Sequence, residues 1–210
     1  MENKDRILEK ATDLYMRYGI RSITMDEIAS QLGISKKTIY QFFTDKDEMV
    51  EAVVDQEVKK SADECLHCKG IAENAVEEIF IAIDMTDELL KAMNPLIMYD
   101  LEKHHPKAFK KLRDHKYQFM YRMIKENIER GIKEELYRPE INIDVITKSR
   151  IESAFMGFSQ DIFPQSKYKI SEVAYELAMF FLHGMTTTKG KKLIEKYSNE
   201  RIKHKQRLYE

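Results

Sequence analysis

The chain has 210 residues, of which 43% are hydrophobic and 34% charged, so it is composed like a globular, strongly solvated protein. Only seven glycines and four prolines are present, which argues against an all-β sandwich or barrel and favours long helices. No apolar run approaches a membrane span, the charged N-terminus lacks a signal-peptide core, and two cysteines make no disulfide framework, so we expect a cytoplasmic chain without membrane contact.

The first predicted helix carries apolar side chains at helical spacing from residue 7 to residue 18. Gly19 comes next, at a position where a helix C-cap favours a positive φ. Thr24 has the character of an N-cap for a second helix, and Glu27 three residues later completes a capping box. Gly33 then ends this second helix.

A third helix is predicted from Lys36 to about Phe42, with Ser35 as its cap. The short Gly-containing connection before it is that of a helix-turn-helix. Apolar residues of this segment can fill a small core, which leaves cations, hydroxyls and an amide on the outside, the groups that bind phosphates and base edges. These outward residues are Lys36, Lys37, Thr38, Tyr40 and Gln41.

Asp45 opens a fourth helix, with Glu48 as a second capping pair, and we expect this helix to connect to the remaining residues over 45–65. Prolines and Gly131 punctuate the chain beyond this helix and predict further helices. Their ranges are near 72–93, 95–104, 107–131, 142–163, 170–188 and 190–206. The fold class is therefore all-α, with about nine or ten helices.

Three stretches resemble the tetracycline-repressor (TetR) family of bacterial transcriptional regulators. They are Gly19-Ile20-Arg21-Ser22-Ile23-Thr24-Met25-Asp26-Glu27-Ile28-Ala29, then Leu32-Gly33-Ile34-Ser35, then Thr38-Ile39-Tyr40-Gln41-Phe42-Phe43-Thr44-Asp45-Lys46-Asp47-Glu48. The resemblance implies a helix-turn-helix DNA-binding domain at 1–48 and a helical ligand-binding and dimerisation domain at 49–210. It covers about a quarter of the chain, from residue 5 to residue 55.

The resemblance also implies roles for single residues. Tyr40 and Lys46 match phosphate contacts, and Thr24 matches the hydroxyl residue that meets the DNA backbone at the start of the second helix. The expected DNA-binding set is Thr24, Ser35, Lys36, Lys37, Thr38, Tyr40, Gln41 and Lys46. Lys37 and Gln41 depart from the residues common in the family, which leaves the DNA sequence that is read open. Residues 1–50 hold 8 basic and 9 acidic side chains, an unusual balance for a DNA-binding unit.

In the resembled family the middle helices hold an effector and the last two core helices form a four-helix dimer interface. Methionine adapts to irregular apolar ligands, and tyrosine adds a polar group to such a wall. The implied pocket residues are Met98, Tyr99, Tyr117, Met120, Tyr121, Ile124, Phe155 and Phe158. The implied interface residues, taken from broad apolar stripes, are Ile151, Ala154, Val173, Leu177 and Phe181. Any of these can instead be ordinary core.

Two features allow other functions. Cys65 and Cys68, at i and i+3 beside His67, could bind a soft metal or act as a redox switch, but a structural zinc site needs four ligands. His104 and His105 could meet an anion or a metal, although a solvated pair at a helix end is the more frequent case. No phosphate-binding loop, catalytic motif or metal-ligand motif occurs, so we expect no enzyme and no cofactor.

The resulting hypothesis is a homodimeric, ligand-responsive transcriptional repressor. It binds a palindromic, double-stranded DNA operator and is released by an unknown small apolar or amphipathic effector. The alternatives are a metal- or thiol-sensing regulator that uses the two cysteines, and a helical dimer that does not bind DNA.

Overall fold

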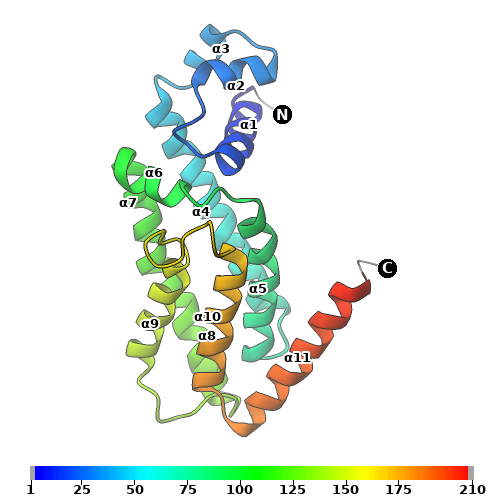
Figure 1. Cartoon of the computed structure of the whole chain (residues 1–210). Coiled ribbons are helices and arrows are strands. Elements are labelled where there is room, and N and C mark those ends of the chain that lie inside the picture. Colours follow the sequence, from blue (N-terminus) through cyan, green and yellow to red (C-terminus); the bar gives the residue numbers. More distant parts are fainter. Residues whose placement is uncertain (1–2, 208–210) are drawn as a thin grey trace. The chain divides into compact units, whose positions relative to one another are not determined.

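The computed structural model describes the backbone of residues 3–207 and the side chains of residues 3–203. Regular structure in this range is helical, apart from one isolated antiparallel bridge between Tyr137 and Thr186 (Figure 1). The helices of the described range are α1 (Asn3–Tyr18), α2 (Met25–Leu32), α3 (Lys36–Tyr40), α4 (Lys46–Ile71), α5 (Ala75–Ala92), α6 (Ile97–His104), α7 (Pro106–Asp114), the π-helical η1 (His115–Met120), α8 (Tyr121–Lys133), α9 (Ile143–Met156), α10 (Ile170–Met185) and α11 (Thr188–Arg207).

The all-α prediction is confirmed. Helical residues run without a break from Pro106 to Lys133, so α7, η1 and α8 follow one another as one continuous helical stretch, as expected for 107–131. Counted that way, the described residues form ten helices. The six-residue π segment inside this stretch was not predicted, because i→i+5 bonding leaves no simple sequence pattern.

Two predicted boundaries are wrong. The fourth helix extends to Ile71 instead of ending near Cys65, because no proline or glycine interrupts it before Gly70. The helix predicted over 142–163 ends at Met156, and Gly157 begins an irregular segment that continues to α10. The apolar side chains in residues 158–163 extended the helical pattern in the sequence beyond the real helix.

The chain divides into two compact units. Unit 1 holds the residues up to 63 together with 89–116, and unit 2 holds 64–88 together with the residues from 117 onward. Unit 1 thus contains the whole predicted DNA-binding domain and also α6 and α7. The predicted boundary between a DNA-binding domain at 1–48 and a ligand-binding domain at 49–210 is a functional division, and it remains a prediction.

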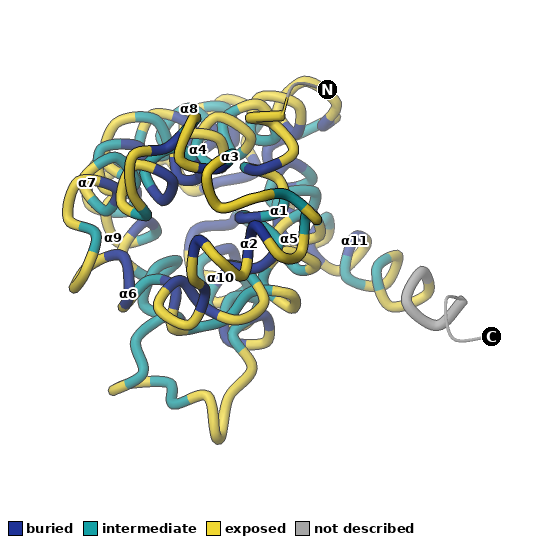
Figure 2. The backbone as a smooth tube through the Cα atoms, turned by 90° about the horizontal axis from the view of Figure 1, so that it is seen from above, coloured by how far each residue is buried: buried dark blue, intermediate teal, exposed yellow. Residues whose placement is uncertain are grey.

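The core of unit 1 brings α1, α2, α3 and the start of α4 together with α6 and α7. Its buried apolar side chains include Ile7 and Leu14 of α1, Ile28 of α2, Ile39 of α3 and Met49 of α4. Buried stretches alternate with exposed ones along the helices in Figure 2, which is the pattern of amphipathic helices around a core.

The core of unit 2 includes a buried polar contact. The Tyr137 hydroxyl donates to the carbonyl oxygen of Ala75 at 2.9 Å and to Oδ1 of Asn127 at 3.2 Å. The Asn127 amide also donates to the Ala75 carbonyl, so the start of α5 is tied to α8. Such buried groups are tolerated because they are paired. Among the described residues, no helix has the length and apolar content needed to cross a membrane.

Candidate nucleic-acid interface

The second helix is held in place by its predicted capping box. The backbone N–H of Glu27 donates to Oγ1 of Thr24 at 3.2 Å, and the backbone N–H of Thr24 donates to Oε2 of Glu27 at 2.7 Å. The backbone N–H and the hydroxyl of Thr24 both donate to the Glu27 carboxylate, and these two hydrogen bonds lower the pKa of Glu27. Thr24 is therefore exposed but engaged, and it fixes the N-terminus of α2 at the surface.

The turn between α2 and α3 has the predicted form. Gly33 adopts φ 67°, in the left-handed region that glycine enters without strain. Ser35 caps α3 by accepting from the backbone N–H of Thr38 at 3.1 Å, and the two hydroxyls lie 2.8 Å apart. Ile39 and Phe43 are buried beneath α3, so the opposite side of this helix faces outward.

The recognition face, which we define as Lys36, Lys37, Tyr40 and Gln41, is exposed as predicted. Lys36 is paired with Asp26 of α2 at 2.7 Å, which raises the pKa of Lys36, and its Nζ lies 5.8 Å from the Tyr40 ring centroid. Within the described residues, the side chains of Lys37 and Gln41 have no hydrogen-bond partner. They are the members of this face most free to meet a phosphate or a base edge. Thr38, also predicted here, is half-buried and its hydroxyl is engaged with Ser35.

Lys46, a predicted phosphate contact, is not fully exposed to solvent. It is half-buried, and its Nζ donates to the carbonyl oxygen of Ile20 at 2.6 Å and lies 6.0 Å from the Tyr15 ring centroid. Burial lowers the pKa of Lys46, although Asp100, Glu27 and Asp47 oppose the shift. In this structure Lys46 ties the first turn of α4 to the loop between α1 and α2.

Sequence reasoning missed three residues that bind α6 and α7 to the rest of unit 1. Buried Asp100 accepts from the backbone N–H of Arg21 at 3.0 Å. His105, whose side chain is only 10% exposed, places Nδ1 2.7 Å from Oδ1 of Asp47. Lys111 lies 2.7 Å from Asp55 of α4. His105 is therefore not part of the solvated pair expected at 104–105. Asp100 lies on the same side of α6 as the buried apolar residues Ile97 and Leu101. An acidic residue at this spacing in the sequence could have indicated a buried, hydrogen-bonded carboxylate.

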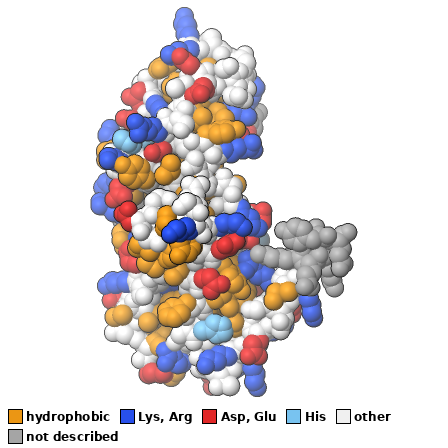
Figure 3. All heavy atoms as spheres, in the orientation of Figure 1, with side chains coloured by type: hydrophobic (Ala, Val, Ile, Leu, Met, Phe, Trp, Pro, Cys, Tyr) orange, Lys and Arg blue, Asp and Glu red, His pale blue; other side chains and the backbone are white. Residues whose placement is uncertain are grey.

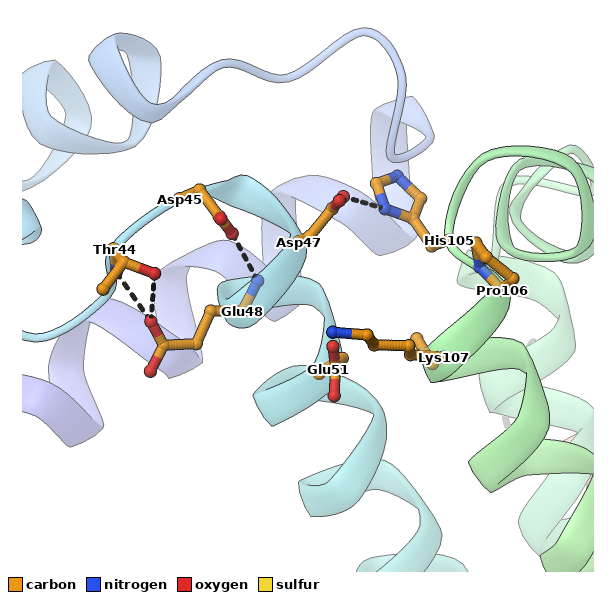
Figure 4. A pocket seen from close by; sticks show the side chains of 9 residues that line it. Thr44, Asp45, Asp47, Glu48, Glu51, His105, Pro106 and Lys107 are labelled. Atoms are coloured by element: carbon orange, nitrogen blue, oxygen red, sulfur yellow. Dashed lines mark hydrogen bonds and ion pairs between the residues drawn. The ribbon is translucent and has the colours of Figure 1, made fainter.

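Next to the contact between His105 and Asp47 lies a hollow of about 360 Å³ (Figure 4). The start of α4 and the junction of α6 with α7 form its walls. Its lining residues are Thr44, Asp45, Asp47, Glu48, Glu51, His105, Pro106, Lys107 and Ala108. None of them belongs to the predicted effector pocket. Glu48 accepts from the backbone and hydroxyl of Thr44, and Asp45 caps α4 through the backbone N–H of Glu48, so these acids serve the helix start.

The predicted pocket residues fall in both units. Met98 and Tyr99 belong to α6 in unit 1, and Tyr99 is half exposed. The other six lie in unit 2. Two of these residues are tyrosines that bind α9: the Tyr117 hydroxyl donates to Glu152 and the Tyr121 hydroxyl to Asp144, each at 2.7 Å. The remaining four are half-buried: Met120, Ile124, Phe155 and Phe158.

The predicted interface residues on α9 and α10 differ in exposure. Ile151 and Val173 are 1% and 7% exposed, so they are core residues of unit 2. Ala154, Leu177 and Phe181 are half-buried. The strongest surface signal is Phe180, which is 82% exposed. Figure 3 shows apolar side chains open to solvent over the part of unit 2 where Figure 1 places α9 and α10.

The two cysteines lie on α4, where neither is disulfide-bonded. Cys68 is buried with its Sγ 3.0 Å from Sδ of Met85, and burial raises the pKa of this thiol. A thiol in that state is a poor nucleophile and a poor metal ligand. The described part of the chain contains no cluster of three or more His, Cys, Asp or Glu side chains suited to a metal ion.

Comparisons with known proteins agree with this geometry. The sequence model of the bacterial regulatory proteins of the tetR family matches residues 7–53. The chain is 30% identical over 107 residues to an uncharacterised HTH-type transcriptional regulator, YvaF, from Bacillus subtilis. That match covers 50% of this chain and 55% of the relative, so the chain spans about half the length of the curated relative it matches.

Solved structures share the fold over most of both chains. A TetR-family transcriptional regulator from Agrobacterium tumefaciens superposes with a TM-score of 0.72 at 15% identity, over 88% of this chain and 97% of the other. A putative transcriptional regulator from Saccharomonospora viridis in complex with choline gives a TM-score of 0.70 at 21% identity, over 88% and 97%. The proteins to which the chain is similar are regulators and not enzymes.

Proposed function

The chain belongs to the tetR family of bacterial regulatory proteins, and from this premise we propose that it represses transcription by binding a DNA operator. Such a protein works where the chromosome lies, in the cytoplasm. The observation that carries the proposal is the recognition face of α3. It is exposed, it comes directly after a capped turn, and it offers Lys37 and Gln41, which have no partners within the described residues.

The proposed contacts divide into two kinds. Lys36, Lys37, Tyr40 and the hydroxyls of Thr24, Ser35 and Thr38 offer groups that bind phosphate oxygens and so position the protein. Gln41 can make paired hydrogen bonds with an adenine edge and so read the DNA sequence. Lys46 supports the surface through its bond to Ile20, and a phosphate contact would require it to leave that carbonyl.

The proposed assembly is a homodimer, because a palindromic operator needs two recognition helices related by a two-fold axis. Phe180 and half-buried Leu177 support a second copy on the α9–α10 face of unit 2. An 82% exposed phenylalanine is costly in water, and association would remove it from solvent.

The proposed effector is a small apolar or amphipathic molecule that binds the middle helices and releases the operator. The fold can hold a small molecule, since a neighbour at 21% identity was crystallised with choline. The half-buried aromatic and methionine side chains of unit 2 are suited to such a ligand. Within unit 1, Asp100 hydrogen-bonds to Arg21, just before the helix-turn-helix, and His105 hydrogen-bonds to Asp47 of α4. These contacts connect α6 and its junction with α7 directly to the DNA-binding elements. An effector that favours one arrangement of these contacts would change operator affinity.

Selection of bound duplexes from a random DNA pool tests the proposal, followed by affinity measurements for the enriched sequence at two salt concentrations. We expect an enriched palindrome, bound by two chains, with affinity falling steeply as salt rises because phosphate contacts release counterions. A chain that enriches no sequence even at low salt, while remaining an intact dimer, would instead be a helical dimer without DNA binding.

A further inference from the structure

Arg150 of α9 is half-buried, and part of its guanidinium lacks a partner among the described residues. Its guanidinium lies 5.5 Å from the ring centroid of Phe181 on α10. Nη1 is fully buried and has no hydrogen-bond partner among the residues that the structure describes. Burial alone lowers the pKa of Arg150 to about 10. Buried charged groups in proteins are normally paired, and the described residues supply no partner for this nitrogen.

The acidic side chains of the neighbouring helices do not supply that partner. On α9, Asp144 is bonded to Lys148 and Tyr121, and Glu152 accepts from Tyr117. The acids of α8, α9 and α10 are all exposed or paired with other groups: Glu126, Glu129, Asp144, Glu152, Glu172 and Glu176.

Apolar side chains flank Arg150 on its own helix and on α10. One turn away on α9 lie half-buried Ile146 and Ala154, and Phe181 covers the guanidinium from α10. The two hydroxyls at this spacing are bonded to backbone: Thr147 donates to the carbonyl of Ile143, and Ser153 to the carbonyl of Arg150 itself. A single cation with apolar neighbours is complementary to an amphipathic anion, because the charged group of the ligand can pair with the cation while its apolar part contacts the surrounding side chains.

We propose that Arg150 binds the anionic headgroup of the effector, a carboxylate, sulfonate or phosphate attached to an apolar body. This proposal rests on the proposed function, because it assumes that unit 2 receives an effector. The planar guanidinium can donate two parallel hydrogen bonds to such a headgroup, which a lysine cannot do. A carboxylate from a second copy of the chain is the rival counter-ion, and the oligomeric state of an Arg150 variant separates the two.

A matched pair of fluorescent dyes tests the proposal: 1-anilinonaphthalene-8-sulfonate and its neutral parent, N-phenyl-1-naphthylamine. We expect the full-length protein to prefer the sulfonate, and Arg150→Met to weaken sulfonate binding about tenfold or more while leaving the neutral dye within about twofold. Arg150→Met should also raise the Tm of the ligand-free protein, because it removes an uncompensated buried charge. Lys148→Met removes an exposed cation from the same helix and should do neither.

Three results would overturn the proposal: equal affinity of the wild type for both dyes, a lower Tm for Arg150→Met, or a monomeric Arg150→Met variant. The last would place the counter-ion on a second copy. If the methionine variant does not fold, Arg150→Lys keeps the charge but loses the paired donors. It should weaken the sulfonate alone, and unchanged sulfonate affinity would count against the site.

Operator binding, measured on the same proteins, keeps this inference distinct from the proposed function. If DNA binding persists but the dyes are not discriminated, the anion site is wrong and the regulator stands. If the sulfonate depends on Arg150 but no operator is bound, the regulator is wrong and the anion site stands.

Discussion

Gly131 of α8 lies against the ring of Tyr137, the buried tyrosine that bonds to Ala75 and Asn127. A Cβ at this position would overlap the ring. Gly131→Ala should therefore destabilise the protein by about 1–3 kcal/mol, since overpacking outweighs the helix propensity that alanine adds. Urea unfolding measures the loss. Gly70→Ala is the control, because a Cβ at this position would meet no atom within 4 Å apart from its chain neighbours and its own helix backbone, and the change should be neutral or stabilising.

Glu27 gives a residue-scale prediction about pH. Its pKa is lowered by Thr24 from the ordinary value of 4.5, so the folded state favours the carboxylate form more than the unfolded state does. The resulting stability is present above the unfolded pKa and is lost as pH falls through the lower, folded pKa. Glu27→Gln cannot titrate, so it should flatten the acid limb of stability measured by urea unfolding between about pH 3 and pH 7. Glu9→Gln, at an exposed position on α1, should leave that limb unchanged.

At the scale of single elements, we expect some side chains of α3 to contact DNA phosphates and others to contact base edges. Lys37→Ala should weaken binding to all DNA sequences and reduce the slope of log K against log salt by about 1, since one phosphate contact is lost. Lys191→Ala, an exposed cation of α11 in unit 2, is the matched control. An unchanged slope in Lys37→Ala would remove Lys37 from the phosphate contacts.

Gln41, at the end of the same helix, carries a different prediction. A glutamine that reads an adenine edge discriminates by about 1–3 kcal/mol at one base pair. Gln41→Ala should therefore relax specificity at a single operator position and leave non-specific affinity and salt slope unchanged. Binding to a panel of single-base operator variants measures this. A uniform loss across the panel would assign Gln41 to the backbone and not to a base.

The sequence predicted helix caps and turns correctly where the interacting residues lie within a few positions of one another. The Thr24–Glu27 box, the turn at Gly33 and the cap at Ser35 all lie within four residues of their partners. Partners distant in sequence leave no such pattern. The local sequence around Lys46 does not show that its Nζ bonds to the carbonyl of Ile20 across 26 residues. Nor does it show that His105 meets Asp47 across 58 residues.

The same limit explains the interface prediction. Apolar periodicity on α9 and α10 marks faces that avoid water, but it does not tell which face the chain itself covers. Ile151 and Val173 are covered internally, whereas Phe180, beside the predicted Phe181, is not. Burial in the folded chain therefore determines which apolar side chains of α9 and α10 stay exposed and can contact a second copy of the chain.

The proposal for the whole molecule depends on association through the α9–α10 face. Phe180→Glu places a charge where the apolar contact would form, and it should convert the dimer to a monomer in sedimentation velocity. Operator binding should weaken strongly because two half-sites are no longer engaged together, while the helical content stays unchanged, since Phe180 is 82% exposed in the single chain. Leu66→Glu makes the same change at an exposed position of α4 and should leave a dimer. A dimeric Phe180→Glu variant would place the two-fold contact on another surface of the chain.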